Sequence, residues 1–410
     1  MDAIQLVKNN EPKDDCSQSL ALMTRDEIEK VRAFHKSFPQ YARTPLAALK
    51  DLAKESGLAG IYIKDESYRF GLNAFKVLGG SFAMARFIAK TTGKDVSALG
   101  YDKLISEDTR KELGEYTFFT ATDGNHGRGV AWAANQMGQK SVVYMPKGSS
   151  DMRLKNIQKE GARASIEDMN YDEAVRKAAA ESAVTPKSVV IQDTAWEGYE
   201  EIPGWIMQGY GTMALEALEQ LNELGVDRPT HVIVQAGVGS LAGAVQGFFA
   251  NAFPDNCPTT IVVEASAADC LYRSVSKGDG STVNVGGDLD TIMAGLACGE
   301  PNIISWKILK NKTSYFVSLP DWAAAGAMRL LSSPVGDDPR VISGESGAAG
   351  MGFLQSLLQK KEYAVWREEV GIDENSHVLL FSTEGDTDPQ RYRDIVWDGM
   401  YPSFTADEVF

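Results

Sequence analysis

Apolar and polar positions follow two different periods along most of the chain. Short apolar runs of strand length, bounded by Gly, Pro or Asp, alternate with longer segments in which apolar residues recur every three or four positions. The first pattern predicts strands and the second predicts helices. Their regular alternation is typical of a mainly parallel sheet with helices on both faces. The predicted fold class is therefore α/β.

A compact group of alternating strands and helices is predicted in the first half of the chain. Its elements are expected at residues 115–122, 126–138, 140–146, 152–161, 171–183 and 188–193. This group is large enough for a small domain. A chain of 410 residues exceeds what one hydrophobic core usually supports. We therefore expect a small domain over 88–195 and a large, discontinuous domain over 1–87 and 196–410.

The large domain is predicted to contain further units on both sides of this insertion. Strands are expected at 60–66 and 259–265, and helices at 74–93 and 206–225. Segment 230–250 is predicted to be a strand followed by a glycine loop and a helix. Segment 376–387 is predicted to be a strand followed by a polar loop. Residues 274–291 are rich in Gly, Asp and Ser and are predicted to form a surface loop.

Composition and charge limit the classes of partner. The chain has 41 Lys and Arg against 56 Asp and Glu, a formal charge of −15 that disfavours nucleic acid and anionic membranes. Its N-terminus lacks a signal-peptide pattern, and no apolar run is long enough to span a bilayer. We therefore expect a cytoplasmic protein with no nucleic-acid or membrane partner.

Cysteine and histidine spacing gives no sign of a metal site. The four cysteines form no CxxC pair, and the four histidines are scattered without ligand spacing. We expect no bound metal and no disulfide framework. Whether Cys270 and Cys298 meet in space is left open by the sequence.

Lys76 stands among apolar neighbours in the stretch "YRFGLNAFKVLGG", where it is expected in the first turn of a helix. A lysine in such a place is usually a surface residue whose stem lies along the core. The alternative is that burial lowers the pKa of its amine, so that the free base can attack a carbonyl.

The stretch "VQAGVGSLAG" follows an apolar strand and opens a helix. Its backbone N–H groups can converge on a phosphate, and the loop residues concerned are Gly237, Val238, Gly239, Ser240 and Leu241. A dinucleotide site begins in the same way, with Glu264 standing where a ribose-binding acid would be expected. However, the spacing here is GxGxxxG and not GxGxxG. A phosphate monoester site, a nicotinamide dehydrogenase and a turn without ligand all remain open from these residues alone.

The order and separation of four motifs resemble those of the fold type II family of pyridoxal-phosphate enzymes, which includes serine and threonine dehydratases and tryptophan synthase β. These motifs are "KDESYRFGLNAFKVLGG", "TATDGNHGRGVAWAA", "GVGSLAG" and "FSTEGD". Longer strings, among them "DTAWEGY", "IMAGLACGEPN" and "ISGESGAAG", are similar to those of the diaminopropionate ammonia-lyases within that family. The resemblance covers nearly the whole chain. It implies two open, twisted, mainly parallel sheets, pyridoxal 5'-phosphate as cofactor and a homodimer.

The implied activity is α,β-elimination on D- and L-2,3-diaminopropionate, which gives pyruvate and two molecules of ammonia. A lyase similar to the serine and threonine dehydratases is the nearest alternative, and an NAD-dependent dehydrogenase is a more distant one. A catalytically silent sensor built on the same fold is a third.

The resemblance also implies roles for individual residues. Lys76 would form the Schiff base with the cofactor, and the glycine loop would bind its phosphate. The other residues placed at the cofactor are Phe75, Asn125, Glu345, and Ser382 or Thr383. Phe75 would wall the cofactor, Asn125 would meet its 3-hydroxyl oxygen, and one of the two hydroxyls would meet the pyridine nitrogen. For Glu345, pairing with a helix N-terminus is an equally good account, and His126 is expected to be structural.

Two aspartates are the expected general bases. Asp123 precedes the "GNHG" turn, where most dehydratases of this fold have Ser or Ala, and Asp193 ends the predicted strand "SVVIQD". For an isolated aspartate at a strand end, a turn or capping role is the commoner one. With the resemblance, we expect Asp123 to remove the α-proton of the D substrate and Asp193 that of the L substrate.

Overall fold

The computed structural model describes residues 2–403. Within them, eleven strands form two open sheets, a large one of seven strands and a small one of four. Neighbouring strands are parallel except at the two edges of the large sheet, where β1 and β2 run antiparallel to their neighbours. The predicted α/β class with two mainly parallel sheets is confirmed.

The large sheet has a core on each face. Its strands, in spatial order, are β1 (Gln5–Lys8), β10 (Tyr315–Leu319), β9 (Thr259–Ala265), β8 (His231–Gln235), β11 (His377–Ser382), β3 (Gly60–Asp65) and β2 (Leu46–Ala48). Along β8, Val232 and Val234 join one hydrophobic cluster while Ile233 joins the other. Because both faces are covered, the inner strands are apolar runs without polar alternation.

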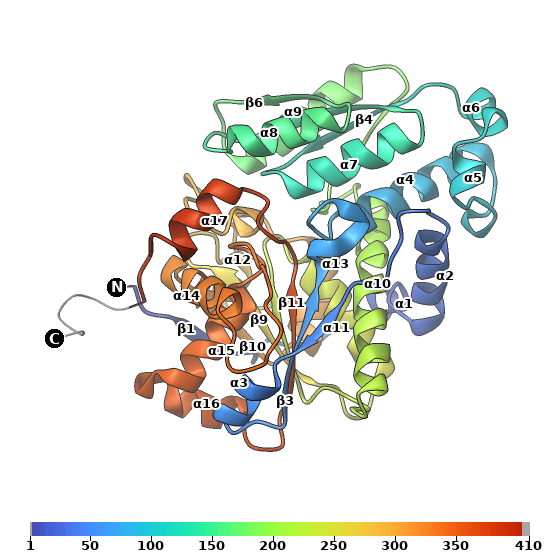
Figure 1. Cartoon of the computed structure of the whole chain (residues 1–410). Helices are drawn as coiled ribbons and strands as arrows, with labels where there is room; N and C mark the ends of the chain where they lie inside the picture. The colour runs from blue at the N-terminus through green and yellow to red at the C-terminus, as the bar shows by residue number, and fades with distance from the viewer. Residues whose placement is uncertain (1, 404–410) are drawn as a thin grey trace.

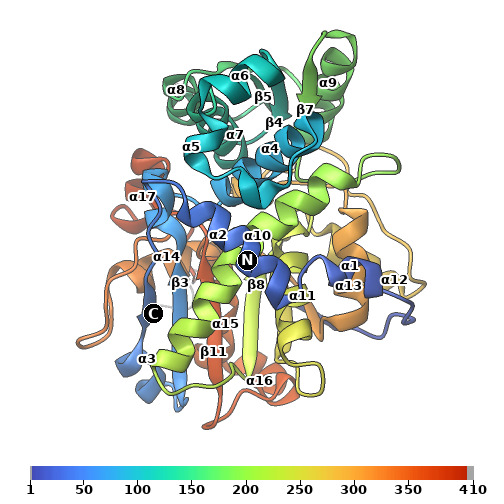
Figure 2. The same ribbon diagram turned by 90° about the vertical axis from the view of Figure 1, so that its right-hand side faces the viewer.

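Helices cover both faces of this sheet (Figure 2). One face packs against helices α1 (Ser17–Ala21), α2 (Arg25–Lys36), α10 (Glu201–Glu223), α11 (Ser240–Ala252), α12 (Cys270–Lys277) and α13 (Ile303–Lys312). The other packs against α3 (Lys50–Glu55), α14 (Asp321–Ser332), α15 (Ala349–Gln359), α16 (Ala364–Val370) and α17 (Pro389–Val396). We call the large sheet with these helices the large unit. No helix in residues 2–403 is both long and apolar enough to cross a membrane.

The small sheet is parallel throughout and lies beside the large unit (Figure 1). Its order is β6 (Arg163–Ile166), β5 (Lys140–Met145), β4 (Thr117–Ala121) and β7 (Ser188–Val190). Helix α9 (Tyr171–Val184) packs on one face, and α7 (Asn125–Gln136) and α8 (Asp151–Lys159) pack on the other. We call this sheet with α7, α8 and α9 the small unit. Strand β6 was not among the predicted strands.

Helix α4 (Val77–Thr92) lies at the junction of the two units (Figure 1). Glycines allow helices of both units to approach its start closely. A Cβ at Gly209 of α10 would lie 2.4 Å from the carbonyl oxygen of Leu78, and one at Gly129 of α7 would lie 2.8 Å from the nitrogen of Val77. The residue just before this helix is therefore held between the two units. The predicted boundary at residue 88 falls within α4, and the division into domains stays a prediction.

The remaining elements are short connections. They are the 3-10 turns η1 (Glu66–Gly71), η2 (Val96–Ala98), η3 (Ala294–Leu296) and η4 (Lys361–Tyr363), and the helices α5 (Tyr101–Leu104) and α6 (Glu107–Leu113). The predicted loop over 274–291 is correct from residue 278, whereas residues 274–277 still belong to α12.

Two predicted elements near the junction differ from the structure. The predicted helix 74–93 begins only at Val77, because the Phe75 N–H donates to the carbonyl of Thr383 and so ties this segment to the end of β11. Lys76 is consequently the residue that precedes the helix. The predicted strand 188–193 ends at Val190, because the Gln192 side chain accepts the N–H of Ala121 in place of a strand neighbour.

Candidate active site

A cavity lies between the two units, beyond the carboxyl ends of the inner strands of the large sheet. Open α/β sheets bind their ligands at this edge. The cavity is lined by Phe75, Lys76, Asp123, Asn125, Asp193, Gln235, Gly237, Val238, Gly239, Ser240, Leu241, Gly295, Leu296, Cys298, Ser346, Thr383 and Glu384. All the predicted site residues are among them except Glu345 and Ser382.

The ammonium of Lys76 pairs with the Oδ2 atom of Asp193. It also lies over the rings of Phe75, at 5.4 Å, and Tyr210, at 5.9 Å from the ring centres. Burial lowers the pKa of Lys76, but the charge and hydrogen bond of Asp193, together with Tyr210, raise it more, so that the pKa lies above its ordinary value. The sequence-based alternative of a lowered lysine pKa is therefore wrong, because a carboxylate from another segment compensates for burial.

Asp193 is held from several sides. The hydroxyls of Tyr171 and Tyr210 lie 3.4 and 3.5 Å from its two carboxylate oxygens. Its backbone carbonyl accepts hydrogen bonds from the Ser240 hydroxyl and, at 2.9 Å, from the Asn302 amide. Burial raises the pKa of Asp193, but the charge and hydrogen bond of Lys76, together with His126, hold the pKa below its usual range. Asp193 is therefore an ionised carboxylate fixed beside the lysine amine.

The glycine loop connects β8 to α11 and faces the cavity. Gly239 has a φ of 100°, in the left-handed region that favours glycine. A Cβ there would also lie 2.8 Å from the Ser305 hydroxyl. Asn302 fixes the loop, because its N–H donates to the Val238 carbonyl at 2.8 Å and its amide donates to the Ser240 hydroxyl at 2.8 Å. The loop presents backbone N–H groups at the start of a 13-residue helix, an arrangement that suits an anion.

The two candidate hydroxyls at the end of β11 point to different sides. Thr383 lines the cavity, and its hydroxyl accepts a hydrogen bond of 2.9 Å from the Gln235 amide. Ser382 lies outside the cavity lining, and its hydroxyl donates to that of Ser343 at 2.8 Å. Successive side chains of a strand point to opposite faces, so only one of the pair can face the cavity. The structure selects Thr383.

Asn125 begins α7 and reaches across to the large unit. Its amide donates to the Oε2 atom of Glu384, whose other oxygen accepts the N–H of Ser346 at 3.1 Å. Asn125 thus lines the cavity, as predicted, and also joins the two units.

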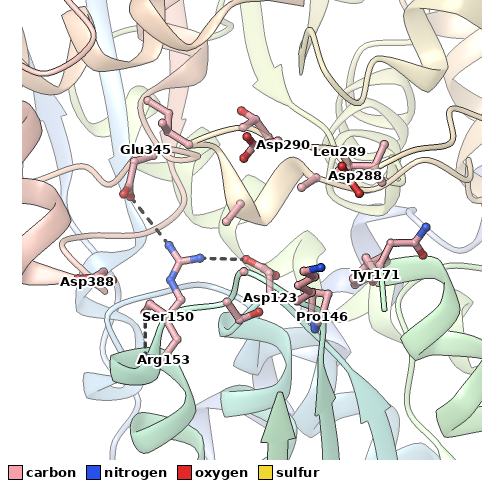
Figure 3. A pocket seen from close by; sticks show the side chains of 18 of the residues that line it. Asp123, Pro146, Ser150, Arg153, Tyr171, Asp288, Leu289, Asp290, Glu345 and Asp388 are labelled. Atoms are coloured by element: carbon pink, nitrogen blue, oxygen red, sulfur yellow. Dashed lines mark hydrogen bonds and ion pairs between the residues drawn. The ribbon is translucent and has the colours of Figure 1, made fainter. Parts of the chain in front are cut away.

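Asp123 lies between β4 and α7 and lines both the cavity and a second pocket, which we call the mouth of the site (Figure 3). Its side chain is 18% exposed, and its Oδ2 atom lies 3.3 Å from the Nη1 atom of Arg153. Burial raises the pKa of Asp123 to about 6, although the charge of Arg153 opposes this rise. The two predicted bases therefore differ, since Asp123 can exchange its proton near neutral pH, whereas Asp193 is ionised while the Lys76 ammonium lies beside it.

Glu345 lies in this second pocket and outside the main cavity. It is 2% exposed and lies 4.0 Å from Arg153 and 3.8 Å from Arg391, measured between charged atoms. Burial raises its pKa to about 7. The helix that follows begins four residues later, at Ala349. Glu345 was predicted either to line the cofactor or to pair with a helix N-terminus. Its side chain instead lies near two arginines in the second pocket.

Several residues of the site were not identified from the sequence. They are Arg153, Tyr171, Tyr210, Gln235, Cys298, Asn302, Ser346 and Glu384. Glu384 stands in the motif "FSTEGD", which was used only for its hydroxyls. Gln235, Cys298, Asn302 and Ser346 also stand in quoted motifs, but no role was assigned to them. Arg153, Tyr171 and Tyr210 stand in helices without a local pattern that distinguishes them. His126 is buried, and its Nε2 atom bonds the carbonyl of Ile191 at 2.8 Å, while its Nδ1 atom lies 4.0 Å from the Oδ2 atom of Asp193. Its structural role stays a prediction.

Comparisons with known proteins agree with this geometry. A family model described as "Pyridoxal-phosphate dependent enzyme" matches residues 38–367. A diaminopropionate ammonia-lyase of Salmonella typhimurium is 52% identical over 382 residues, which cover 93% of this chain and 94% of that protein. The chain belongs to the diaminopropionate ammonia-lyase family.

Solved structures of this ammonia-lyase family share the fold. The crystal structure of the Escherichia coli diaminopropionate ammonia lyase in complex with D-serine has a TM-score of 0.90 at 46% identity, covering 97% of this chain and 98% of that chain. The E. coli enzyme in complex with an aminoacrylate-PLP azomethine reaction intermediate has a TM-score of 0.88 at 45% identity and covers 98% of both chains.

The residues of the cavity fit pyridoxal phosphate, the cofactor of the ammonia-lyase family. The glycine loop leaves a cradle that a side chain would fill, since a Cβ at Gly237 would lie 3.2 Å from the Cys298 sulfur. The donor set also matches the chemistry of the cofactor. Backbone N–H groups are available for the phosphate, the Lys76 amine for the aldehyde, and the Thr383 hydroxyl for the ring nitrogen.

Family membership excludes the nicotinamide dehydrogenase, and the position of Glu264 explains why that alternative fails. This carboxylate is buried and accepts the N–H groups of Leu271 and Tyr272 at 2.8 and 2.6 Å. It therefore binds the first turn of α12 and is not available to a ribose. The four cysteines are free, with the Cys270 sulfur lying 3.8 Å from the carbonyl oxygen of Cys298.

Proposed function

We propose that this chain is a diaminopropionate ammonia-lyase that releases ammonia from both D- and L-2,3-diaminopropionate and forms pyruvate. One observation carries the proposal. A lysine amine, two carboxylates from different segments and a glycine loop at a helix start line the same cavity. An uncharged dehydratase site has no need of two carboxylates, whereas a substrate with a second ammonium does.

Bound pyridoxal phosphate supplies an electron sink that makes the α-proton of the amino acid acidic. In our proposal, the Lys76 amine would hold the cofactor covalently. The glycine loop would bind the phosphate, and Phe75 would form one wall. Asn125 would bind the 3-hydroxyl oxygen and Thr383 the ring nitrogen.

The proton transfers are assigned to the two aspartates and to the freed Lys76 amine. The α-protons of the D and L forms point to opposite sides when the rest of the substrate keeps its place, so one fixed base cannot reach both. Asp123 comes from the small unit at the mouth, while Asp193 lies beside the lysine amine. We assign Asp123 to the D form, and Asp193, helped by Lys76, to the L form.

The elimination then breaks the bond between the β-carbon and its nitrogen. The α-proton passes to the base, the β-nitrogen leaves as ammonia, and water releases the second ammonia together with pyruvate. The carboxylates that line the site suit the positive charge of the β-ammonium before it leaves.

Stoichiometry tests this function directly. Purified protein supplied with pyridoxal phosphate is incubated with D-diaminopropionate, L-diaminopropionate or serine, and pyruvate and ammonia are measured. We expect two molecules of ammonia for each pyruvate from both diaminopropionates. Turnover of serine alone, with one ammonia for each pyruvate, would support the dehydratase alternative instead. Cofactor binding without any pyruvate would support the sensor.

We further infer that the enzyme is a homodimer. The resemblance to fold type II enzymes supports this inference. Light scattering during gel filtration measures the mass and would reject the dimer if a single chain eluted.

A further inference from the structure

Arg153 lies between two carboxylates in the pocket at the mouth of the active site (Figure 3). Its Nη1 atom is 3.3 Å from Asp123, and its Nη2 atom is 4.0 Å from Glu345. Asp123 belongs to the small unit, as Arg153 does, whereas Glu345 belongs to the large unit. One guanidinium therefore contacts a proposed base and also spans the gap between the units.

The small unit fixes the position of Arg153. The backbone N–H of Arg153 donates to the Ser150 hydroxyl at 3.2 Å, and this hydroxyl caps the start of α8. Its stem packs against the turn that carries Asp123, because a Cβ at Gly124 would lie only 3.0 Å from the Cδ atom of Arg153. The whole residue is 7% exposed. The guanidinium is thus held in place by packing as well as by charge.

We propose that Arg153 is a positioning residue for Asp123, aiming its carboxylate and keeping it ionised while Glu345 anchors the guanidinium from across the gap. This proposal rests on the proposed function, in which Asp123 is the base for the D substrate. Arg153 acts through Asp123 and is not assigned a contact with the substrate.

The charges around Asp123 support this role. The titratable groups that interact electrostatically with Asp123 are Arg153, Lys76, Glu384, Tyr171 and Cys298. Burial raises the pKa of Asp123, Glu384 raises it further, and Arg153 provides the largest opposing effect, ahead of Lys76. Removal of the guanidinium must therefore raise the pKa of Asp123, so that the carboxylate becomes protonated at a higher pH.

The second contact links this charge to the arrangement of the units. Glu345 is also approached by Arg391 of α17, at 3.8 Å. Two arginines, one from each unit, thus converge on a single buried carboxylate. Separation of the units would remove Glu345 from Arg153 but would leave Asp123 in contact with it.

The test compares kcat/KM on the D and L substrates as a function of pH in the enzyme loaded with cofactor. The variants are Arg153→Gln, Arg153→Lys and Glu345→Gln. Arg176→Gln is the matched control, because Arg176 of α9 also pairs across the gap, with Glu300 at 2.9 Å, but both side chains are exposed and neither contacts Asp123. Thermal unfolding and cofactor absorbance verify that each variant is folded and loaded.

We expect Arg153→Gln to move the acid limb of the D profile toward higher pH by about one to two units, a change typical of losing a charged neighbour. Below the original pKa, where the carboxylate is largely protonated in both proteins, this lowers kcat/KM about 10- to 100-fold. The L profile should change much less. Arg153→Lys should keep the acid limb near its original pH while lowering the rate, and Glu345→Gln should weaken D turnover less than Arg153→Gln does. In the Asp123→Asn background, Arg153→Gln should have little further effect.

An infrared difference titration, parent minus Asp123→Asn, gives the pKa of Asp123 without turnover. If the pKa of Asp123 does not rise in folded Arg153→Gln, the inference is overturned. The inference is also overturned if the pKa of Asp123 rises equally in Arg176→Gln. If Arg153→Gln does not fold, Arg153→Lys provides the test instead. Because it keeps the positive charge, a shift of its acid limb by about the one to two units expected for complete loss of the charge would overturn the inference. Absence of pyruvate from the unmodified enzyme would reject the proposed function, while the titration would still decide the role of Arg153.

Discussion

A buried ion network beneath the segment that leads to Lys76 should make a large contribution to stability. Lys64 of β3 and Arg69 of η1 both bind the Oε2 atom of Glu216, at 2.8 and 2.7 Å, and all three side chains are fully buried. Tyr41 donates a further hydrogen bond of 2.7 Å to the Oε1 atom of Glu216. Glu66 is the second carboxylate of the cluster, bound to Arg69 at 2.8 Å.

The change to make is Glu216→Gln, which keeps the shape of the side chain and removes its charge. It leaves two buried cations with one carboxylate. Removing one partner of a buried ion pair typically costs about 3 to 5 kcal/mol, which lowers the folding equilibrium constant by a factor of about 100 or more. We expect a loss of this size in urea-induced unfolding, followed by fluorescence.

Glu219→Gln provides the control on the same helix. Glu219 pairs with Arg32, but its side chain is 29% exposed, and partly exposed pairs usually contribute about 1 kcal/mol or less. Losses of equal size in the two variants, or a loss below about 1 kcal/mol for Glu216→Gln, would refute the reasoning, because burial would then add nothing to the pair.

The same network predicts a pH dependence. Burial raises the pKa of Glu216, but Arg69 and Lys64 lower it more, so the folded-state pKa lies below the ordinary value. A group with a depressed folded-state pKa stabilises the protein above its unfolded pKa, and this stabilisation is lost as the pH falls toward the folded value. The acid branch of stability against pH should therefore be shallower in Glu216→Gln.

Three further predictions concern the catalytic cavity. Lys76→Ala should abolish turnover, and mass spectrometry after borohydride reduction of the parent should find the pyridoxyl group on Lys76; its presence on another lysine would contradict the assignment. Gly239→Asp should weaken cofactor affinity, measured by equilibrium dialysis, because it blocks the approach to the loop and adds a negative charge; unchanged affinity would place the phosphate elsewhere. Asp123→Asn should lower pyruvate formation from the D form by about 10²- to 10⁴-fold and Asp193→Asn that from the L form, with cofactor absorbance retained; equal losses on both forms would exclude the two-base mechanism.

The sequence by itself determined the fold class, the family and most of the residues that line the cavity. A parallel sheet that is covered on both faces requires strands that are continuous apolar runs, and such runs are local features of the sequence. Their alternation with helices could therefore be predicted without coordinates. The glycine loop was equally local, because strand, glycines and helix follow one another in the printed sequence from 230 to 250.

Only the tertiary structure decided the charge states and the orientation of side chains. The pKa of Lys76 is raised because Asp193, more than a hundred residues away in the chain, lies beside its amine. The choice of Thr383 over Ser382 depended on which face of the strand end meets the cavity. Arg153 reaches Asp123 only because α8 and the β4–α7 turn pack together. Electrostatic interactions act through space and depend on burial, and neither distance between segments nor burial is written in a local pattern of residues.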